Sequence, residues 1–175
     1  MPDTRPNSKF NENGVCMGCL SYENQKNIDW KKRLNDLKSY VEKYRGINGN
    51  DYDCAIAVSG GKDSHFQVYY MKEVLKMNPV LLSVAPIDST ETGKHNFENL
   101  SDTFGCDVIT LNPNRQLARK LGKISFEEIG PPTWYSDALI YAYPYKMAMK
   151  LGIKLLVYGE NVNYSYGGTY CEDTP

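Results

Sequence analysis

The sequence lacks several features that would define other classes of protein. Its 175 residues contain no apolar run near the ~18 residues that a membrane-spanning helix needs. The start carries charges and prolines where a secretory signal places apolar residues. The formal net charge is only -1, so no general basic field attracts nucleic acid or an anionic membrane. These absences predict a cytoplasmic protein that binds neither nucleic acid nor membrane.

The sequence also lacks the cysteine pattern of a disulfide-bonded protein. The five cysteines comprise one close pair and three scattered single residues, which is not the pattern of a disulfide framework. With 41% hydrophobic residues, the chain has enough apolar surface for one core, so disorder is not expected as its main state.

The chain divides into two parts of different charge. Residues 1–50 hold nine Lys/Arg against six Asp/Glu, whereas residues 51–175 hold eleven against fifteen. A Gly/Asn cluster at 46–50 marks a boundary, and the apolar spacing before it predicts one helix over 28–45. We therefore expect an N-terminal Cys-x-x-Cys segment plus helix over 1–50 and a second domain over 51–175.

After residue 50, short apolar segments alternate with amphipathic ones. The predicted strands cover 54–58, 80–84, 107–111 and 154–158, and the predicted helices cover 62–77, 94–104, 115–129 and 137–151. The glycine and two prolines at 130–132 predict a loop over 130–136. Strands that alternate with helices need crossover connections, so the predicted fold is α/β with a doubly wound parallel sheet.

One motif between the first predicted strand and the next helix carries chemistry. It consists of Ser59, Gly60, Gly61, Lys62, Asp63 and Ser64. The two glycines allow a tight turn and close approach of a ligand, and the helix N-terminus that follows suits a phosphate. The serines add hydroxyl donors, and Lys62 adds a mobile positive charge. Asp63 would be repelled by a phosphate unless Mg²⁺ or a basic group lies between them.

The spacing differs from the Walker A loop and resembles the SGGxDS pyrophosphate loop (PP-loop) of the ATP pyrophosphatases, the adenine-nucleotide alpha hydrolase superfamily. The resemblance implies the strand order 3-2-1-4, with the ligand crevice between the first and fourth strands. It also implies an ATP site in which Gly159, Glu160 and Asn161 face the loop, while Val84 and Ala85 lie beside the adenine.

Further motifs resemble the N-acetyl sugar amidotransferase family of lipopolysaccharide and flagellin-sugar biosynthesis. They are Met1–Pro6, Phe10–Cys19, Ile28–Trp30, Tyr52–Cys54 with Val58–Ser64, Thr92–Gly93 with Asn96 and Glu98–Leu100, Phe126–Gly130, and Tyr158–Asn161. Membership implies ATP-dependent conversion of the N-acetyl group of a nucleotide-activated sugar, such as a precursor of pseudaminic acid, to an acetamidino group. The partner would be a glutamine amidotransferase subunit that supplies ammonia. Members are longer than this chain, which is expected to be the N-terminal half of such an enzyme, with the PP-loop domain truncated at its C-terminal side.

The resemblance assigns roles to named residues. Lys62 and Asp63 would be catalytic: Lys62 would offset charge on the phosphates and Asp63 would hold Mg²⁺. Three residues of the predicted loop over 130–136 would stack on the sugar or its nucleotide carrier, unless they pack on their own domain. These residues are Thr133, Trp134 and Tyr135.

The N-terminal cysteine pair has three interpretations. Cys16 and Cys19 have the spacing of half a Zn²⁺ site, which Cys171, a histidine or residues beyond this chain would have to complete. Unligated thiols and a redox dithiol are the alternatives.

Two other functions are compatible with the same loop. A tRNA-thiolating enzyme would use the same ATP chemistry but should carry a basic stripe, whereas residues 51–175 are acidic overall. A nucleotide-binding module without turnover would not need both Lys62 and Asp63.

Overall fold

The computed structural model describes residues 9–49, 51–86 and 88–160. The described helices and strands are α1 (Met17–Gln25), α2 (Trp30–Glu42), β1 (Cys54–Ala57), α3 (Lys62–Tyr69), the π-helical turn η1 (Tyr70–Val74), β2 (Pro79–Val84), α4 (Glu91–Phe104), β3 (Val108–Leu111), α5 (Arg115–Ile129), α6 (Trp134–Lys150) and β4 (Leu156–Val157). Two compact units divide the chain, one of residues 1–37 with 160–175 and one of Lys38–Gly159.

The first unit places the cysteine pair at the start of a helix. Cys16 is the N-cap residue of α1 and pairs with Phe10 in an isolated antiparallel bridge. The turn between them is held by the side chain of Asn11, which accepts hydrogen bonds from the N–H groups of Asn13 and Val15. The sequence analysis predicts only the helix over 28–45 in this part of the chain, and α1 is an additional helix that forms without an apolar stripe at helical spacing.

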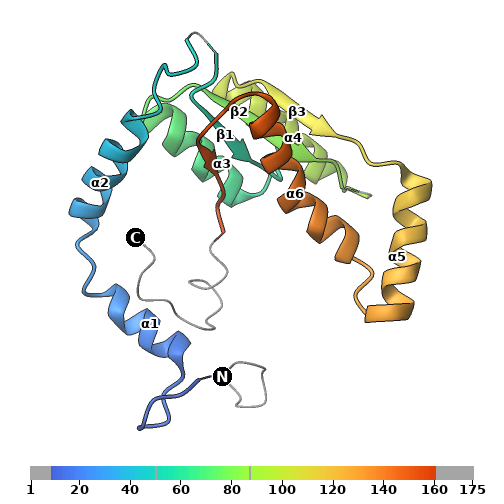
Figure 1. The fold of residues 1–175 in the computed structure, drawn as a ribbon, viewed down its shortest axis with the longest axis horizontal. Helices are drawn as coiled ribbons and strands as arrows, with labels where there is room; N and C mark the ends of the chain where they lie inside the picture. Colours follow the sequence, from blue (N-terminus) through green and yellow to red (C-terminus); the bar gives the residue numbers. More distant parts are fainter. Residues whose placement is uncertain (1–8, 50, 87, 161–175) are drawn as a thin grey trace. The chain divides into compact units, whose positions relative to one another are not determined.

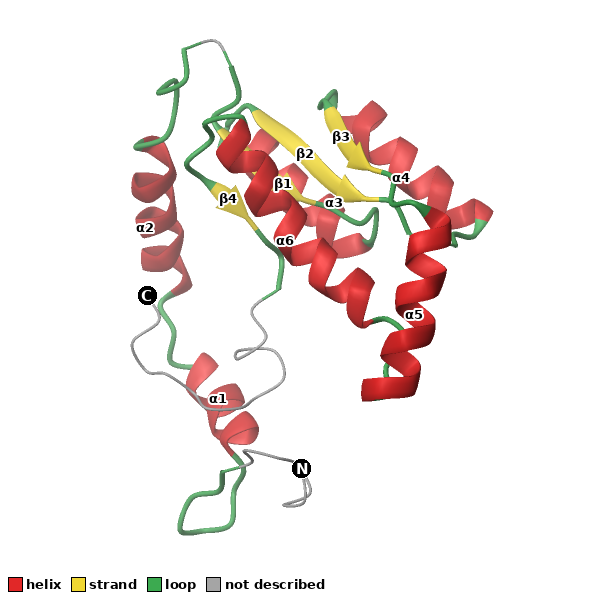
Figure 2. Cartoon of the chain, turned by 45° about the vertical axis from the view of Figure 1, so that its right-hand side comes forward, coloured by secondary structure: helices red, strands yellow, loops and turns green. Residues whose placement is uncertain are grey.

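The second unit is built on a four-stranded parallel sheet in the order β3-β2-β1-β4, as predicted. Figure 2 shows β1 and β2 as the central strands and α6 passing across one face of the sheet. Helix α5 packs against helix α6 beside the sheet, as Figures 1 and 2 both show. All carboxyl ends of the strands therefore lie along one edge, where a doubly wound fold binds its ligands.

Two cores form because successive strand residues point to opposite faces. Cys54 and Ile56 of β1 pack with Val68 of α3 and Leu100 of α4 on one face. On the other face, Ala55 of β1 and Val80 and Leu82 of β2 pack with Ala148 of α6. Full burial of β1 explains why its sequence is a continuous apolar run rather than an alternating one.

Several predicted boundaries shift in the structure. The helix predicted over 62–77 is regular only to Tyr69 and continues as the π-helical turn η1. The predicted loop over 130–136 is shorter, because α6 begins at Trp134 and so includes Trp134 and Tyr135 in its first turn. Thr133 is the N-cap residue of α6, and its hydroxyl donates to Asp137 at 2.9 Å, which helps the helix start early.

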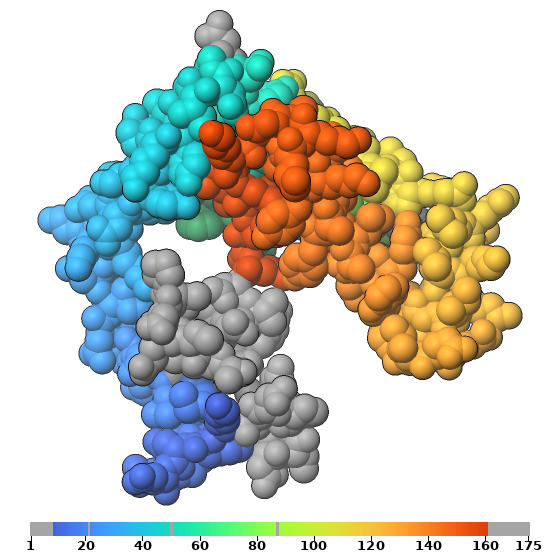
Figure 3. All heavy atoms as spheres, in the orientation of Figure 1, coloured from blue at the N-terminus to red at the C-terminus, as the bar shows by residue number. Residues whose placement is uncertain are grey.

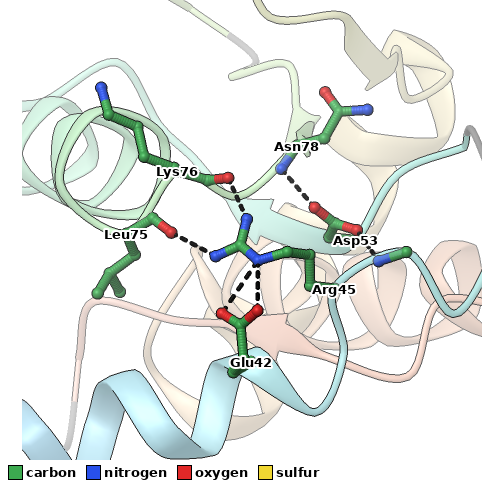
Figure 4. A network of polar contacts seen from close by, with 7 residues as sticks. Glu42, Arg45, Asp53, Leu75, Lys76 and Asn78 are labelled. Atoms are coloured by element: carbon green, nitrogen blue, oxygen red, sulfur yellow. Dashed lines mark hydrogen bonds and ion pairs between the residues drawn. The ribbon is translucent and has the colours of Figure 1, made fainter.

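A polar network fixes the amino end of β1 (Figure 4). The carboxylate of Asp53 is 7% exposed and accepts hydrogen bonds from the backbone N–H groups of Gly46 at 2.6 Å and Asn78 at 2.8 Å. Beside it, the guanidinium of Arg45 donates to both carboxylate oxygens of Glu42. It also donates to the backbone carbonyl oxygens of Leu75 and Lys76, which follow the π-helical turn. The network joins the segment before β1 to the segment before β2.

The outer face of α6 carries large apolar side chains. In Figure 3 this helix, in orange, lies on the viewed face of the molecule. Trp134, Ile140, Tyr145 and Met149 are all exposed, Met149 by 81%. Even so, none of the helices in the described ranges is both long and apolar enough to cross a membrane.

Replacement of Asp53 by alanine should destabilise the protein by about 1–3 kcal/mol, because two backbone N–H groups in part-buried hydrogen bonds lose a charged acceptor. Urea unfolding measures the change in free energy. Asp51→Ala, two residues away and exposed, is the matched control and should change stability by less than about 0.5 kcal/mol. Equal stability of the two variants would contradict the role given to the Asp53 carboxylate.

Candidate functional site

The predicted phosphate loop follows β1 as a tight turn against helix α4. Gly60 has a φ of +85°, a left-handed conformation that disfavours residues with a Cβ. A Cβ built on Gly60 would lie 3.1 Å from both Cα and Cβ of Phe97 in α4. The loop backbone thus approaches α4 so closely that a side chain at this position would crowd Phe97. Gly61 has an extended conformation, and a Cβ built on it would make only an ordinary contact with the hydroxyl of Ser59 at 3.6 Å.

The helix after this loop begins with free N–H groups. Its N-cap residue is Gly61, which has no side chain to accept a hydrogen bond from the first turn. By contrast, Thr90 caps α4 and Asn114 caps α5 through side-chain oxygens. The N-terminus of α3 therefore keeps both its unpaired donors and its positive dipole end for a ligand. This is the geometry of an anion site.

The two serines hold the loop in shape. The N–H of Ser59 donates to Oγ of Ser64 at 2.9 Å, and the two hydroxyl oxygens lie 3.3 Å apart. Ser64 is buried, whereas Ser59 is exposed. Ser64 thus closes the loop from the helix side, and the hydroxyl of Ser59 stays accessible to a ligand.

The two charged residues of the motif form an exposed ion pair. Nζ of Lys62 lies 2.7 Å from Oδ1 of Asp63, with 89% and 68% of their side chains exposed. The hydrogen bond to Asp63 raises the pKa of Lys62, so the lysine is fully charged at neutral pH. Both side chains can leave this exposed pair at little cost when a phosphate or a cation arrives.

A pocket opens beside the loop at the carboxyl edge of the sheet. Its volume of about 390 Å³ lies within the range of small-molecule sites. The lining residues come from the loop, from the ends of β2 and β3, and from the starts of α4 and α5. They include Ser59, Ser83, Ala85, Phe97, Thr110 and Arg115. The pocket is thus continuous with the phosphate loop through Ser59.

The residues predicted beside the base lie near this pocket. Ala85 lines it, but the N–H of Ala85 donates to the carbonyl of Leu111 at 2.9 Å and so cannot bind a base edge. Val84 precedes it at the end of β2 and is partly exposed. Sequence reasoning missed Phe97 and Arg115, because a residue on a later helix gives no local signal of a ligand.

The end of β4 meets the helix that follows the loop. Gly159 lies against the side chain of Gln67 in α3, which the sequence analysis did not single out. This contact and the pairing of β1 with β4 put Gly159 on the loop side of the sheet edge. Glu160 is exposed, and its position relative to the loop stays a prediction, as does the role of Asn161, which lies outside the described residues.

The structure does not bring together all predicted residues. Thr133, Trp134 and Tyr135 are absent from the lining of the pocket, and the last two belong to a helix rather than to the predicted loop. Their proposed contact with a sugar stays a prediction.

Within the described residues, the cysteine pair is not part of a group of side chains that could hold a metal ion. Cys16 is buried and Cys19 exposed. Hydrogen bonds from the backbone N–H and the thiol of Cys19 lower the pKa of Cys16. No group of three or more His, Cys, Asp or Glu side chains that could hold a metal ion occurs in residues 9–49, 51–86 and 88–160. Cys171 lies outside these ranges, so a Zn²⁺ site would need ligands from elsewhere.

One protein of related sequence covers most of this chain, whereas no family profile matches it. The chain is 23% identical over 154 residues to an uncharacterized protein of Methanocaldococcus jannaschii, covering 87% of this chain and 53% of that protein. The chain thus spans about half the length of this relative.

Two solved structures share the architecture. One is an NH3-dependent NAD synthetase from Campylobacter jejuni in complex with the nitrate ion, with a TM-score of 0.50, 15% identity, and coverage of 78% of this chain and 58% of that chain. The other is the U34-tRNA thiolase NcsA from Methanococcus maripaludis with its [4Fe-4S] cluster, with a TM-score of 0.50, 18% identity, and coverage of 77% and 48%. Together with the observed strand order, these similarities show an α/β fold of the PP-loop type.

Gly60→Ala should destabilise the protein by about 1–3 kcal/mol, because it combines a left-handed φ with a Cβ that presses on the backbone of Phe97. Gly61→Ala is the matched control, since its Cβ meets only the hydroxyl of Ser59 at 3.6 Å. It should change stability by less than about 0.5 kcal/mol. Thermal and urea unfolding of both variants test this, and equal losses would show that the close approach to α4 is unimportant.

Proposed function

We propose that this chain is the nucleotide-binding half of an enzyme that uses ATP to activate a carbonyl oxygen by adenylylation, with release of pyrophosphate. The observation that carries the proposal is the uncapped N-terminus of α3 behind a glycine turn, with Lys62 exposed beside it. Free N–H groups and a mobile cation suit a pyrophosphate leaving group. The adjoining pocket of about 390 Å³ has the size and position for the adenosine part of ATP.

The chemistry follows from the electronic character of an amide. An amide carbonyl is a poor electrophile, because its oxygen is a poor leaving group. Attack of that oxygen on the α-phosphorus of ATP breaks the bond to pyrophosphate and gives an O-adenylylated imidate. A nucleophile then adds to the carbon and displaces AMP, which carries the original oxygen. The loop would bind the departing pyrophosphate, and Lys62 would offset its growing charge.

A magnesium ion fits the charged pair of the loop. Asp63 offers an exposed carboxylate in the first turn of α3, next to the N–H groups that would hold the phosphates. Hard oxygen ligands from one carboxylate and several phosphates are the usual surroundings of Mg²⁺. The ion, when bound, would screen the phosphate charge that otherwise repels Asp63.

The acceptor we propose is the N-acetyl group of a nucleotide-activated sugar, with ammonia as nucleophile from a glutamine amidotransferase partner. The family resemblance of the N-terminal motifs supports this choice, and NH3 also occurs in the name of the similar NAD synthetase. Thiolation of tRNA is the competing function. The chain is similar in fold to the tRNA thiolase NcsA, but residues 51–175 hold eleven Lys/Arg against fifteen Asp/Glu and so bring no net positive charge to attract tRNA.

Lys62→Ala should weaken ATP binding in the presence of Mg²⁺ by about ten- to hundredfold, the loss expected for one charge-assisted contact worth about 1.5–3 kcal/mol. Isothermal titration calorimetry measures the affinity. Lys120→Ala, at an exposed position of α5, is the control and should bind ATP like the original chain. Equal affinity in both variants would remove the loop from the ATP site.

The fate of the acceptor oxygen tests the reaction type. With ¹⁸O in the acetyl carbonyl of the sugar, adenylylation should transfer the label into AMP, because the nucleotide leaves with that oxygen. Mass spectrometry of the products from full-length protein, ATP, ammonium and the labelled sugar detects it. Label in inorganic phosphate together with ADP would mean phosphorylation of the acceptor instead, and would overturn the proposed function.

A further inference from the structure

The side chain of Gln67 occupies the corner between α3 and the carboxyl end of β4. Gln67 lies one helical turn beyond the phosphate loop, three residues after Ser64. A Cβ built on Gly159 would lie 1.8 Å from Nε2 and 2.7 Å from Cδ of Gln67. The amide therefore fills the space that any side chain at position 159 would need. The absence of a side chain at Gly159 is what allows Gln67 to reach this corner.

The oxygen of this amide has no hydrogen-bond partner. Among the described residues, Oε1 of Gln67 is the buried side-chain polar atom without one. A buried acceptor left without a donor destabilises the folded state, and native proteins seldom retain one without a reason. A ligand that brings a donor to this position would remove that destabilisation. The unpaired Oε1 is therefore a candidate acceptor for the donor of a ligand.

The chemistry of the proposed reaction limits which ligand can provide the donor. The phosphates of ATP present only acceptor oxygens at neutral pH once ionised, so they cannot pair with Oε1. The pocket suited to adenosine is lined from the β2 and β3 side and does not include Gln67. Gln67 contacts the end of β4, which lies on the opposite side of β1. The acceptor substrate is the remaining partner.

We propose that Gln67 is a specificity-determining residue for the acceptor, and that its Oε1 receives a hydrogen bond from the N–H of the amide whose carbonyl oxygen is adenylylated. The inference rests on the proposed function and adds to it the residue that selects the acceptor. An acetamido group carries an N–H next to the reacting carbonyl, whereas a hydroxyl at the same sugar position places its donor differently. The contact would both select an amide and turn its oxygen away from Gln67, toward the nucleotide.

Calorimetry with two matched sugars tests the proposal. The probes are UDP-N-acetylglucosamine and UDP-glucose, which differ in the acetamido group, titrated into the full-length protein with Mg²⁺ and α,β-methylene-ATP. The original protein should prefer the acetamido sugar, and Gln67→Met should reduce this preference by roughly five- to tenfold, the effect of one hydrogen bond. The same variant should bind ATP within twofold of the original protein. Gln116→Met, on the exposed surface of α5, should retain the full preference.

Thermal unfolding separates this role from a structural one. Methionine has a similar length and removes the unpaired oxygen, so Gln67→Met should unfold at the same or a higher temperature. A lower unfolding temperature, or an unchanged preference in Gln67→Met, would overturn the role of Gln67 and leave the proposed function intact. Absence of any preference in the original protein would overturn both the acetamido acceptor and the contact with Gln67.

Discussion

The hydrogen bonding of β1 on both of its edges is the constraint from which the candidate site follows. This strand pairs with β2 on one side and β4 on the other, and Cys54, Ala55 and Ile56 are fully buried. The strand therefore ends in the middle of the carboxyl edge, where the sheet order reverses. The chain must turn sharply there to enter α3, and Gly60 makes that turn. The loop therefore leaves the sheet between the ends of β2 and β4.

Much of this architecture could be predicted because its causes are local. A continuous apolar run at Cys54–Ala57 indicates a strand buried on both faces, and the glycines that follow it permit only a tight turn. The alternation of strands and helices then limits the topology to a few arrangements. The observed sheet order is the one that the resemblance to the ATP pyrophosphatases implies.

The remaining features depend on contacts between residues far apart in the sequence. Phe97 and Arg115 reach the pocket from helices whose own patterns describe only amphipathic packing. Gln67 gives no signal on its own, since its meaning depends on Gly159, more than ninety positions later. The two prolines before Trp134 predict a loop, yet α6 begins at Trp134, two residues after the second proline. This second kind of error is local, because the hydroxyl of Thr133 donates to Asp137 and supports a helix start that the composition of the segment does not indicate.

The polar network around Asp53 has a consequence for how the sequence of this protein can evolve. It holds the amino end of β1, whereas the phosphate loop leaves from the carboxyl end, roughly 16 Å further along at the usual rise of a strand. The Asp53 network and the candidate site are thus separated by the length of the sheet. Substitutions of exposed residues around the loop leave the Asp53 network intact, and its contribution to stability can offset part of what such substitutions cost. Exposed residues of the candidate site can therefore vary in evolution while the sheet stays in place.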